Sequence, residues 1–540
     1  MPSHRPGSLS PLRAALFLFG MAVVATGLWI ARSEHLISFD LPDDLDGLYS
    51  YVRTYREVAV GGGILLLGTL IAAFAAFGLL PDRLAGRSLA FVQPWSFRRS
   101  LYPLLAGLAC YATVLGLVLL KDNSPLVFFL FLASLVLISL AIYRADSSPS
   151  DHDLGFRKVD AVILPALAVL VLSLNLVELT HWRFFCIGDE GKFFEMAKYL
   201  AEGGGRSLFD LAGVYETHPI LDSAYQAFSL RVFGATVVGW RLAEIFVLVA
   251  SALLIYALVL LLFGRIPAIV AATILGCNHH LMAFARIGYN NLHCVFYALL
   301  VLLFLALAYR TGRALFVFLT GTAMGLCIYT FAVAYLVWPL VAVLVGIKFL
   351  RRPTLREFEA VVLMFIGFVL VITPGLLTTP PEYFSDLAIK HGTLEPYARE
   401  LEADAGIPML VARISLVQSI LVFWVNPQWY RHYVGGPLLD AVTSVLFLIG
   451  GALGLMQIHK GAVRVAFIWF VMGLLILAFA SYVPHPLFTR LLFLIPACAI
   501  LAAMGAFCLE GALRGLRLPA WLATGMILGL TAAIPVLNLH

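Results

Sequence analysis

VVGWRLAEIFVLVASALLIYALVLLLF, residues 237–263, is the stretch that decides the fold of this 540-residue chain. A run of about 20 apolar residues, rising 1.5 Å per residue, crosses the roughly 30 Å hydrocarbon core of a bilayer. Such a run must be helical, because lipid offers the backbone no hydrogen-bond partners. Similar runs recur from one end of the chain to the other. The sequence therefore predicts an all-α, polytopic bundle of about 13 to 15 transmembrane helices.

About fifteen segments have the length and apolar character of a span. They are residues 12–31, 58–80, 101–120, 125–143, 160–178, 237–263, 267–284, 292–309, 314–330, 332–350, 358–378, 437–456, 464–482, 490–510 and 519–538. The first follows Arg5 and Arg13 and has no convincing cleavage site after it. We therefore expect a retained span there and not a removed signal peptide.

The composition favours the same class. The chain is 61% hydrophobic and 12% charged, with a mean hydropathy of +0.95, whereas soluble domains carry about 25% charged residues. Lys and Arg retained in cytoplasmic loops explain the net charge of +5 better than nucleic-acid binding does. The seven cysteines are scattered without zinc-site spacing, so no disulfide or metal site is assigned to them, and a divalent metal as cofactor stays open without support from the sequence.

The basic residues of the loops predict the orientation. With these spans, most loop Lys and Arg fall on the side of the N-terminus, which the positive-inside rule assigns to the cytoplasm. They are Arg83, Arg87, Arg98, Arg99, Arg144, Arg157, Lys158, Arg310, Arg313, Lys348, Arg351, Arg352, Arg356, Lys460, Arg464, Arg514 and Arg517. We expect a multi-pass protein of a bacterial inner membrane, with its site on the periplasmic side.

Two outer segments are long, residues 179–236 and 379–436. In the first, apolar residues from Phe193 to Leu200 recur at helical spacing, and the glycines at 203–205 are expected to end that helix. A second amphipathic stretch follows His218-Pro219. We expect interfacial helices at both places and at 408–425, each with its apolar face towards the lipid. Because it is long and mixed in charge, 379–436 is expected to bind the acceptor.

Asp189-Glu190, shortly after the fifth span, is the strongest local feature for catalysis. The pair could simply begin a solvated helix, where carboxylates complement the helix dipole. Alternatively, a carboxylate at the edge of the membrane could act as a general base that deprotonates an acceptor hydroxyl. Lys192 follows on the same helix and is a candidate contact for sugar or acceptor.

Cationic and amide side chains gather in four other outer motifs. His218 precedes Pro219. Arg286, Tyr289, Asn290 and Asn291 lie at the end of the seventh span. Arg431 and His432 precede the twelfth span, and His485 and Arg490 precede the fourteenth. Each group could merely snorkel into headgroups or belong to an aromatic belt. However, outer-face cations are the ones that the positive-inside rule does not explain. Together they could hold a lipid phosphate, because guanidinium and imidazolium groups bind phosphate oxygens.

At this point the chain resembles the GT-C superfamily of membrane glycosyltransferases, in the branch of protein O-mannosyltransferases and lipid A aminoarabinose transferases. The resemblance runs over about residues 160–510. An acidic motif followed by an interfacial helix corresponds to Asp189-Glu190. A His-Pro-Pro-Leu motif corresponds to His218 through Leu221, a Ser-Arg-x-Gly element to Ala285 through Gly288, and an Arg-His…Asp stretch to Arg431 through Asp440. A late arginine corresponds to Arg490.

The resemblance implies inverting transfer of a monosaccharide from a polyprenyl-phosphate donor to a glycolipid, polymer or protein. By carry-over Asp189 is the base, beside Glu190, and Arg286 and Arg490 contact phosphate. By position, His218, Arg431, His432 and His485 join the phosphate set, and Lys192, Tyr289, Asn290 and Asn291 bind sugar or acceptor. Ile220 replaces the second proline of the family motif, and Asn290 and Asn291 stand where many relatives carry an acidic residue.

The predicted regions are an additional N-terminal part at 1–159, a catalytic core at 160–378, the acceptor-related segment 379–436 and C-terminal helices at 437–540. One alternative function is a transporter or flippase for a lipid-linked sugar. Transporters place ionisable groups near the bilayer midplane, and Glu244 is the residue that such a function could use. A catalytically inactive scaffold for envelope assembly is the other alternative.

Overall fold

The structure is a computed structural model. It describes residues 9–32, 64–77, 97–146, 154–177, 179–180, 189–351, 353–380, 383, 400, 403–404, 406, 410–424, 436–479 and 488–538. Over this part of the chain it is all-α, and the single β-bridge joins Val214 to His218. The predicted class, a polytopic bundle of apolar helices, is confirmed.

The helices follow the sequence in the predicted order. The long ones are α1 (Pro11–Arg32), α3 (Phe97–Leu119), α4 (Pro125–Ala145), α5 (Asp160–Leu176), α8 (Val237–Leu262), α11 (Leu292–Thr311), α13 (Val337–Arg351), α14 (Leu355–Thr378), α18 (Ala441–Met456), α19 (Gly461–Phe479), α21 (Ile495–Gly515) and α22 (Ala520–Asn538). The shorter ones are α6 (Glu190–Ala201), α7 (Ile220–Phe233), α9 (Arg265–Gly276), α10 (His279–Ile287), α12 (Ala314–Leu326), η1 (Cys327–Tyr329), η2 (Ala332–Leu336), α17 (Leu410–Leu421), α20 (Phe488–Leu491) and η3 (Leu492–Leu494).

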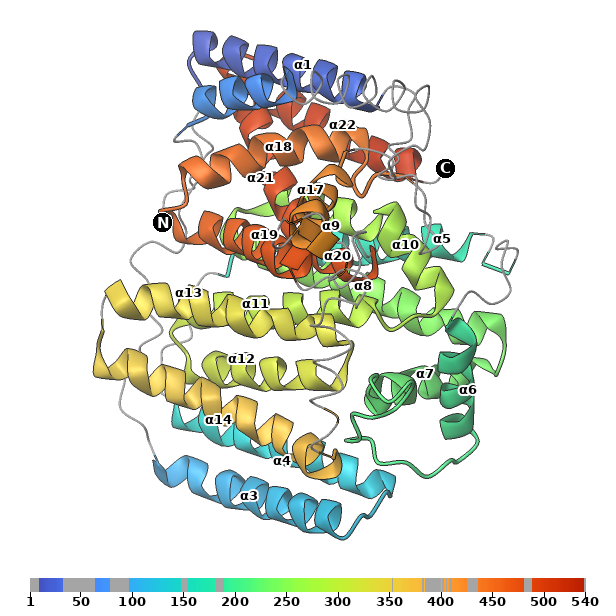
Figure 1. Ribbon diagram of the computed structural model, residues 1–540. Helices are drawn as coiled ribbons and strands as arrows, with labels where there is room; N and C mark the ends of the chain where they lie inside the picture. Colours follow the sequence, from blue (N-terminus) through green and yellow to red (C-terminus); the bar gives the residue numbers. More distant parts are fainter. Residues whose placement is uncertain are drawn as a thin grey trace.

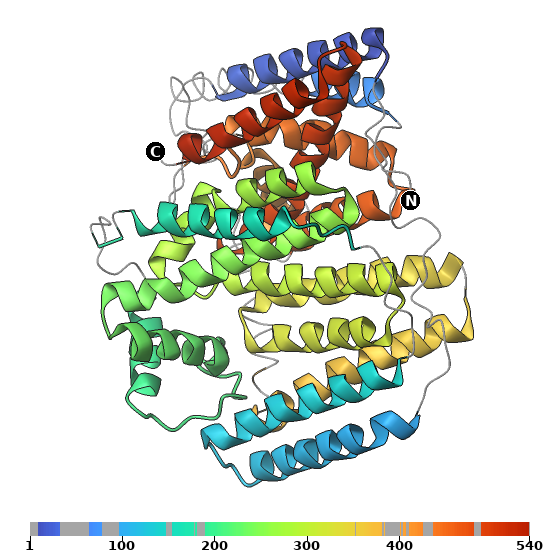
Figure 2. The same ribbon diagram turned by 180° about the vertical axis from the view of Figure 1, so that it is seen from behind.

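Ten of the described helices are long and apolar enough to cross a membrane, and one bent pair would add an eleventh. The other four predicted spans coincide with apolar helices of 10 to 17 residues, for example Ala441–Met456. Figure 1 shows the long helices side by side, with α6 lying crosswise at one end and the α13–α14 link at the other. Seen from behind, α5 runs beside α8 and α9 (Figure 2). The chain is therefore a multi-pass membrane protein.

The seventh span differs from the expected continuous helix over 267–284. It consists of α9 and α10, whose axes meet at an angle of 49°. The cause is Asn278, whose side-chain oxygen accepts hydrogen bonds from the backbone N–H groups of His280 and Leu281, both at 3.1 Å. An asparagine that caps a new helix in this way replaces the bonds that would continue the old one.

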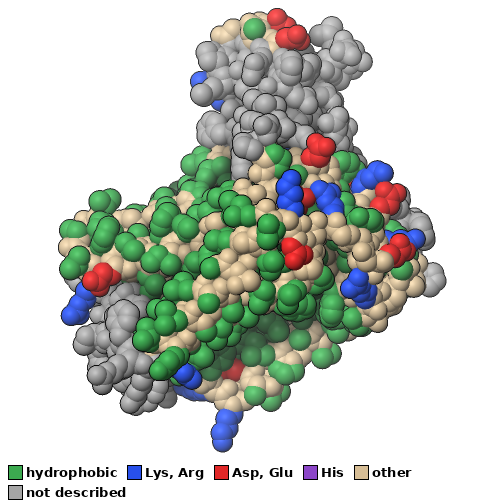
Figure 3. Space-filling model, turned by 90° about the horizontal axis from the view of Figure 1, so that it is seen from below, with side chains coloured by type: hydrophobic (Ala, Val, Ile, Leu, Met, Phe, Trp, Pro, Cys, Tyr) green, Lys and Arg blue, Asp and Glu red, His purple; other side chains and the backbone are tan. Residues whose placement is uncertain are grey.

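Helix α21 lies at the centre of the C-terminal half, and every residue of its apolar window is buried. Glycines allow its close approach to α18, since a Cβ at Gly450 would lie 1.7 Å from the carbonyl oxygen of Leu501. Small residues at such crossings are typical of helix packing in membranes. By contrast, α3 is mostly exposed. Figure 3, which views the molecule from the side of α3 and α4, shows a surface largely covered by hydrophobic side chains. Phe129 of α4 is 65% exposed.

Candidate functional site

Helix α6 places the acidic pair at its first turn. Asp189 is the N-cap residue and Glu190 the first helical residue. The helix ends where the glycines predicted: the N–H of Gly203 bonds to the carbonyl of Leu200, that of Gly204 bonds to the carbonyl of Tyr199, and Gly203 has φ +100°. This double bond pattern with a left-handed residue is the Schellman motif. Helices are present at all three predicted places, as α6, α7 and α17, and their position in the membrane interface stays a prediction.

The carboxylate of Asp189 is exposed, and one side chain from the loop between α6 and α7 holds it in place. The hydroxyl of Tyr215 donates to Oδ1 of Asp189 at 2.8 Å. The backbone N–H of Asp189 donates to the hydroxyl oxygen of Tyr289 at 2.7 Å. Two predicted site segments, the acidic pair and the motif after α10, therefore meet here. The carboxylate is both oriented and open to solvent, as a general base for an external hydroxyl must be.

Glu190 has the opposite environment, because its side chain is 2% exposed. The indole N–H of Trp240 donates to Oε1 of Glu190 at 3.0 Å, and Nε of Arg241 lies 3.5 Å from the same oxygen. Arg241 also donates to the carbonyl oxygen of Leu179. The pair thus divides into an accessible carboxylate and a buried, ion-paired one. Glu190 joins α6 to the first turn of α8.

The loop that carries Tyr215 contains two consecutive non-glycine residues in the left-handed region, Tyr215 at φ +53° and Glu216 at φ +59°. The N–H of Thr217 bonds to the carbonyl of Val214, which closes a turn of the I′ kind. Such residues usually mark a functional constraint, since each costs about 1–3 kcal/mol. In this conformation the Tyr215 hydroxyl reaches Asp189.

His218 follows this turn and is half-buried between rings. It stacks on Phe331 at 5.6 Å between centroids and meets Phe193 edge-on at 4.8 Å. Its Nδ1 lies 3.5 Å from the amide nitrogen of Asn290, so a third predicted segment joins the site. Pro219 then begins α7 as its N-cap residue, as the sequence indicated.

A buried cluster of charged side chains, His293, Asp222 and Glu244, lies next to the residues that contact His218. Nδ1 of His293 lies 2.6 Å from Oδ1 of Asp222, and its Nε2 lies 3.2 Å from Oε1 of Glu244. Both contacts are hydrogen bonds when each ring nitrogen carries a proton, because carboxylates only accept. All three side chains are at most 6% exposed. The cluster ties α7 to α8 and α11.

Two amides complete this cluster. Asn290 donates to Oδ2 of Asp222 at 3.0 Å, and Gln226 donates both to Oε1 of Glu244 at 2.9 Å and to the carbonyl oxygen of Gly288 at 2.8 Å. The side-chain amide of Asn290 therefore contacts both His218 and Asp222. Within the described residues, no group of three His, Cys, Asp or Glu side chains has the arrangement of a metal site.

The motif at the end of α10 has two well-defined roles. Arg286 donates through Nη2 to the carbonyl oxygen of Leu174 in α5 and is 8% exposed. Gly288 has φ +81° and lies against Trp240, where a Cβ would come within 2.2 Å of the indole nitrogen. Only glycine fits that position without movement of Trp240. Asn291, 5% exposed, is the N-cap residue of α11.

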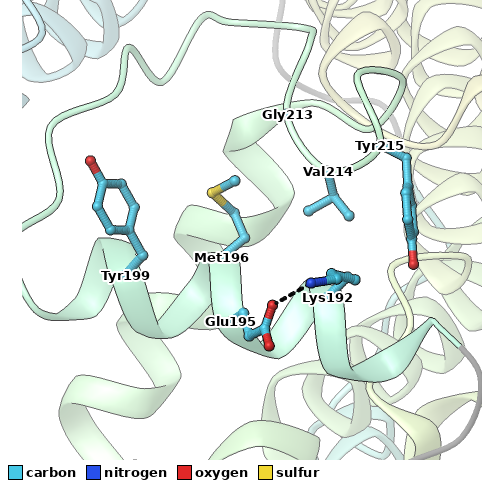
Figure 4. Close-up of a pocket in the computed structure, with 7 residues that line it drawn as sticks. All are labelled: Lys192, Glu195, Met196, Tyr199, Gly213, Val214 and Tyr215. Carbon is cyan, nitrogen blue, oxygen red and sulfur yellow. Dashed lines mark hydrogen bonds and ion pairs between the residues drawn. The ribbon is translucent and has the colours of Figure 1, made fainter.

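Lys192 lines a cavity of about 280 Å³ (Figure 4). Its ammonium group pairs with Glu195 at 3.0 Å. Other walls come from Met196 and Tyr199 of α6 and from Val214 and Tyr215 of the strained turn. Tyr215 therefore belongs both to this cavity and to the setting of Asp189.

The remaining predicted phosphate contacts are less defined. Arg490 is 8% exposed in the short helix α20, which packs against η3 and α19. Arg431, His432 and His485 lie outside the described residues. Of the segment 379–436, the described beginning contacts the loop before α7. Thr379 accepts from the N–H of Leu211, and the Tyr383 hydroxyl donates to the carbonyl oxygen of Thr217.

Sequence reasoning missed Tyr215, Asp222 and His293 as site residues. A signal for two of them was present: Asp222 lies in an amphipathic helix, and His293 lies at the start of an apolar span, three residues after Asn290. Ionisable residues in apolar spans are functional candidates by default. No pattern in the sequence marks Tyr215, because its role depends on a loop conformation.

Comparison with known proteins finds a similarity for this region. Residues 217–376, which include His218, the buried cluster and the α10 motif, match the family model described as dolichyl-phosphate-mannose-protein mannosyltransferase. The chain resembles GT-C superfamily membrane glycosyltransferases. The GT-C resemblance predicted from the sequence motifs is thus confirmed. No curated protein matches the sequence significantly.

Two solved structures match part of the chain more loosely. ArnT from Cupriavidus metallidurans, solved with undecaprenyl phosphate, is 14% identical, and the match covers 71% of this chain and 77% of that one with a TM-score of 0.42. The archaeal oligosaccharyltransferase AglB from Archaeoglobus fulgidus, solved with an inhibitory peptide and dolichol-phosphate, is 12% identical, with 71% and 56% covered and a TM-score of 0.47.

Proposed function

We propose that this chain transfers a monosaccharide from a polyprenyl-phosphate donor to an acceptor hydroxyl at the outer face of the membrane, with Asp189 as the general base. One observation carries the proposal: the carboxylate of Asp189 is exposed, yet it is oriented by Tyr215 at the point where the predicted motifs meet. The family that matches residues 217–376 is described by a dolichyl-phosphate-mannose donor, which supports the donor class.

The reaction is an inverting single displacement. Asp189 accepts the proton of the acceptor hydroxyl while that oxygen forms a bond to the anomeric carbon. The bond from the anomeric carbon to the phosphate oxygen breaks, and polyprenyl phosphate leaves with the electron pair. General-base catalysis of this kind contributes typically about 10²–10⁴-fold in rate. Glu190 is buried and bound to Trp240, so its proposed part is to hold α6 and Asp189 in place.

The leaving phosphate needs positive charge near the anomeric carbon. We assign this to Arg286, Arg490 and His218, with Arg431, His432 and His485 as further members outside the described residues. Tyr289 accepts from the backbone N–H of Asp189 and Lys192 lies three residues further along α6, and we assign both to the binding of sugar or acceptor. Asn290 and Asn291 are both at most 5% exposed, and they support the site from the interior of the protein.

A reconstituted assay tests the base. The purified chain in lipid nanodiscs is given radiolabelled dolichyl-phosphate mannose and undecaprenyl-phosphate sugars, and both transfer to an envelope extract and release of free sugar are measured. Asp189→Asn should lower both rates by about 10²-fold or more while leaving expression and thermal unfolding unchanged. Transfer at the wild-type rate by Asp189→Asn would refute the assignment.

A matched control is Asp122→Asn. Asp122 lies in the α3–α4 link and accepts from the N–H of Ser124 at 2.8 Å, a bond that an asparagine oxygen can keep. This variant should retain full activity. A transporter would instead move the lipid-linked sugar across proteoliposomes without releasing or transferring the sugar.

A further inference from the structure

The cavity beside Asp189 is the feature that the proposed catalytic steps do not use. It lies between α6 and the strained turn and has a volume of about 280 Å³ (Figure 4). Ligand pockets usually begin at about 300 Å³, so this space fits a small group of about one or two rings and not a large headgroup. Its position, next to the proposed base, makes the chemistry of its walls informative.

Two exposed tyrosine rings form opposite walls of the cavity. Tyr199 is 48% exposed and Tyr215 is 45% exposed. The Tyr199 ring rests on Gly204, where a Cβ would come within 2.3 Å of it. Figure 4 shows Met196 between the two rings. The walls are therefore apolar faces, which suit a ligand with an apolar face of its own.

The polar groups at the rim carry no net charge. Lys192 and Glu195 neutralise each other at 3.0 Å, and their side chains are 62% and 67% exposed. An anionic headgroup would meet the Glu195 carboxylate, and a cationic one would meet the Lys192 ammonium group. A neutral ligand with hydroxyl groups can donate to Glu195 and accept from Lys192 at once. A sugar ring combines such hydroxyl edges with C–H faces.

We propose that this cavity is the acceptor subsite and that it takes a neutral carbohydrate. The inference rests on the proposed transferase function. The Tyr215 hydroxyl links the cavity to the reaction, since it donates to Oδ1 of Asp189 at 2.8 Å. A sugar ring seated against Tyr215 would lie one side chain away from the carboxylate that accepts the acceptor's proton. Tyr199 is then a specificity residue for the acceptor.

Binding without donor tests this directly. The full chain in lipid nanodiscs, free of glycoside detergents, is titrated with methyl lactoside, with a glucuronic-acid disaccharide and with a serine tripeptide, and saturation-transfer NMR measures binding. We expect saturable binding of methyl lactoside only. Tyr199→Ala should weaken its Kd by about 3- to 10-fold, the value of an aromatic contact of about 0.5–1.5 kcal/mol, and Tyr199→Phe should retain it.

The matched control is Tyr102→Ala, which removes a tyrosine that is 81% exposed on α3 and should not change binding. A second variant, Gly204→Ala, displaces the Tyr199 ring without removing it and should weaken binding as well. Equal binding by Tyr199→Ala and Tyr102→Ala, or preferential binding of the tripeptide or the acidic disaccharide, would overturn the proposal. If Tyr199→Ala does not fold, the comparison of Gly204→Ala with Tyr102→Ala decides the question.

This experiment is independent of the test of the transferase function. Saturation-transfer binding requires neither donor nor turnover. Absence of sugar transfer by the wild-type chain would refute the proposed function. Methyl lactoside binding that does not change in Tyr199→Ala would refute only the acceptor subsite.

Discussion

The indole N–H of Trp240 donates to the carboxylate of Glu190 at 3.0 Å, and this bond separates the two members of the acidic pair. Glu190 is committed to Trp240 and Arg241 inside the protein, whereas Asp189 faces solvent. Neighbouring carboxylates in sequence thus have a structural and a chemical role. Variants of the two residues should therefore fail in different ways.

Glu190→Gln keeps an oxygen that can accept from Trp240 but removes the charge facing Arg241. Breaking a buried ion pair in this way typically lowers the free energy of unfolding by about 3–5 kcal/mol. We expect a lower unfolding temperature but a specific activity, per folded molecule, within about tenfold of the wild type. Asp189→Asn should show the reverse, with normal stability and activity reduced by about 10²-fold or more. Thermal unfolding and transfer rates measured on the same samples separate the two patterns.

Gly288→Ala should displace Trp240, because the new Cβ would lie 2.2 Å from the indole nitrogen and φ is +81°. Glu190 would lose a buried hydrogen bond, at a cost of about 1–3 kcal/mol. We expect lower stability, and little further loss when Trp240→Phe is added, because both changes remove the same bond. Gly525→Ala is the control, since nothing lies within 4 Å of a Cβ there. Additive losses in the double variant would contradict this account.

His293→Ala leaves the carboxylates of Asp222 and Glu244 buried without the cation between them. We expect a loss of about 3–5 kcal/mol in the free energy of unfolding, as for other broken buried pairs. Adding Asp222→Asn and Glu244→Gln removes the charges and should recover most of the stability. Chemical unfolding of the single and triple variants measures this. A triple variant as unstable as His293→Ala would show that charge is not the cause.

Tyr215→Phe removes only the hydroxyl that donates to Asp189. A hydrogen bond to a charged group contributes about 1.5–3 kcal/mol when buried, and exposure reduces that figure here. We expect kcat to fall by about 3- to 10-fold with little change in thermal unfolding. A kcat equal to that of the wild type would count against a role for Tyr215 in orienting Asp189.

Periodicity and hydropathy predicted the helices well because lipid imposes helical structure on any long apolar run. Even the end of α6 followed from the glycines at 203–205. It was harder to predict which partner a side chain bonds to and which way it points. Nothing in the sequence indicates that Asn278 caps a new helix within a span, or that Glu190 points inward while Asp189 points outward. Those outcomes depend on contacts with Trp240 and Arg241, which lie 50 residues away along the chain.

The cluster around His293 shows the same limit. Its members come from α7, α8 and α11, and each one alone is an ordinary polar residue on a helix. Glu244 was the residue that a transporter could have used. Its Oε1 accepts a hydrogen bond from Gln226 and contacts His293. Glu244 therefore has a structural role in the buried cluster.

The bend at Asn278 has a geometric consequence for the arginine beyond it. The nine residues of α10 form a rod of about 13 Å, and a turn of 49° carries its far end about 10 Å sideways from the axis of α9. This displacement brings Arg286 to the carbonyl oxygen of Leu174 in α5 and Gly288 to Trp240 in α8. A straight helix would end over its own axis and leave both partners out of reach, so one asparagine amide in mid-span sets where the motif at the far end can act.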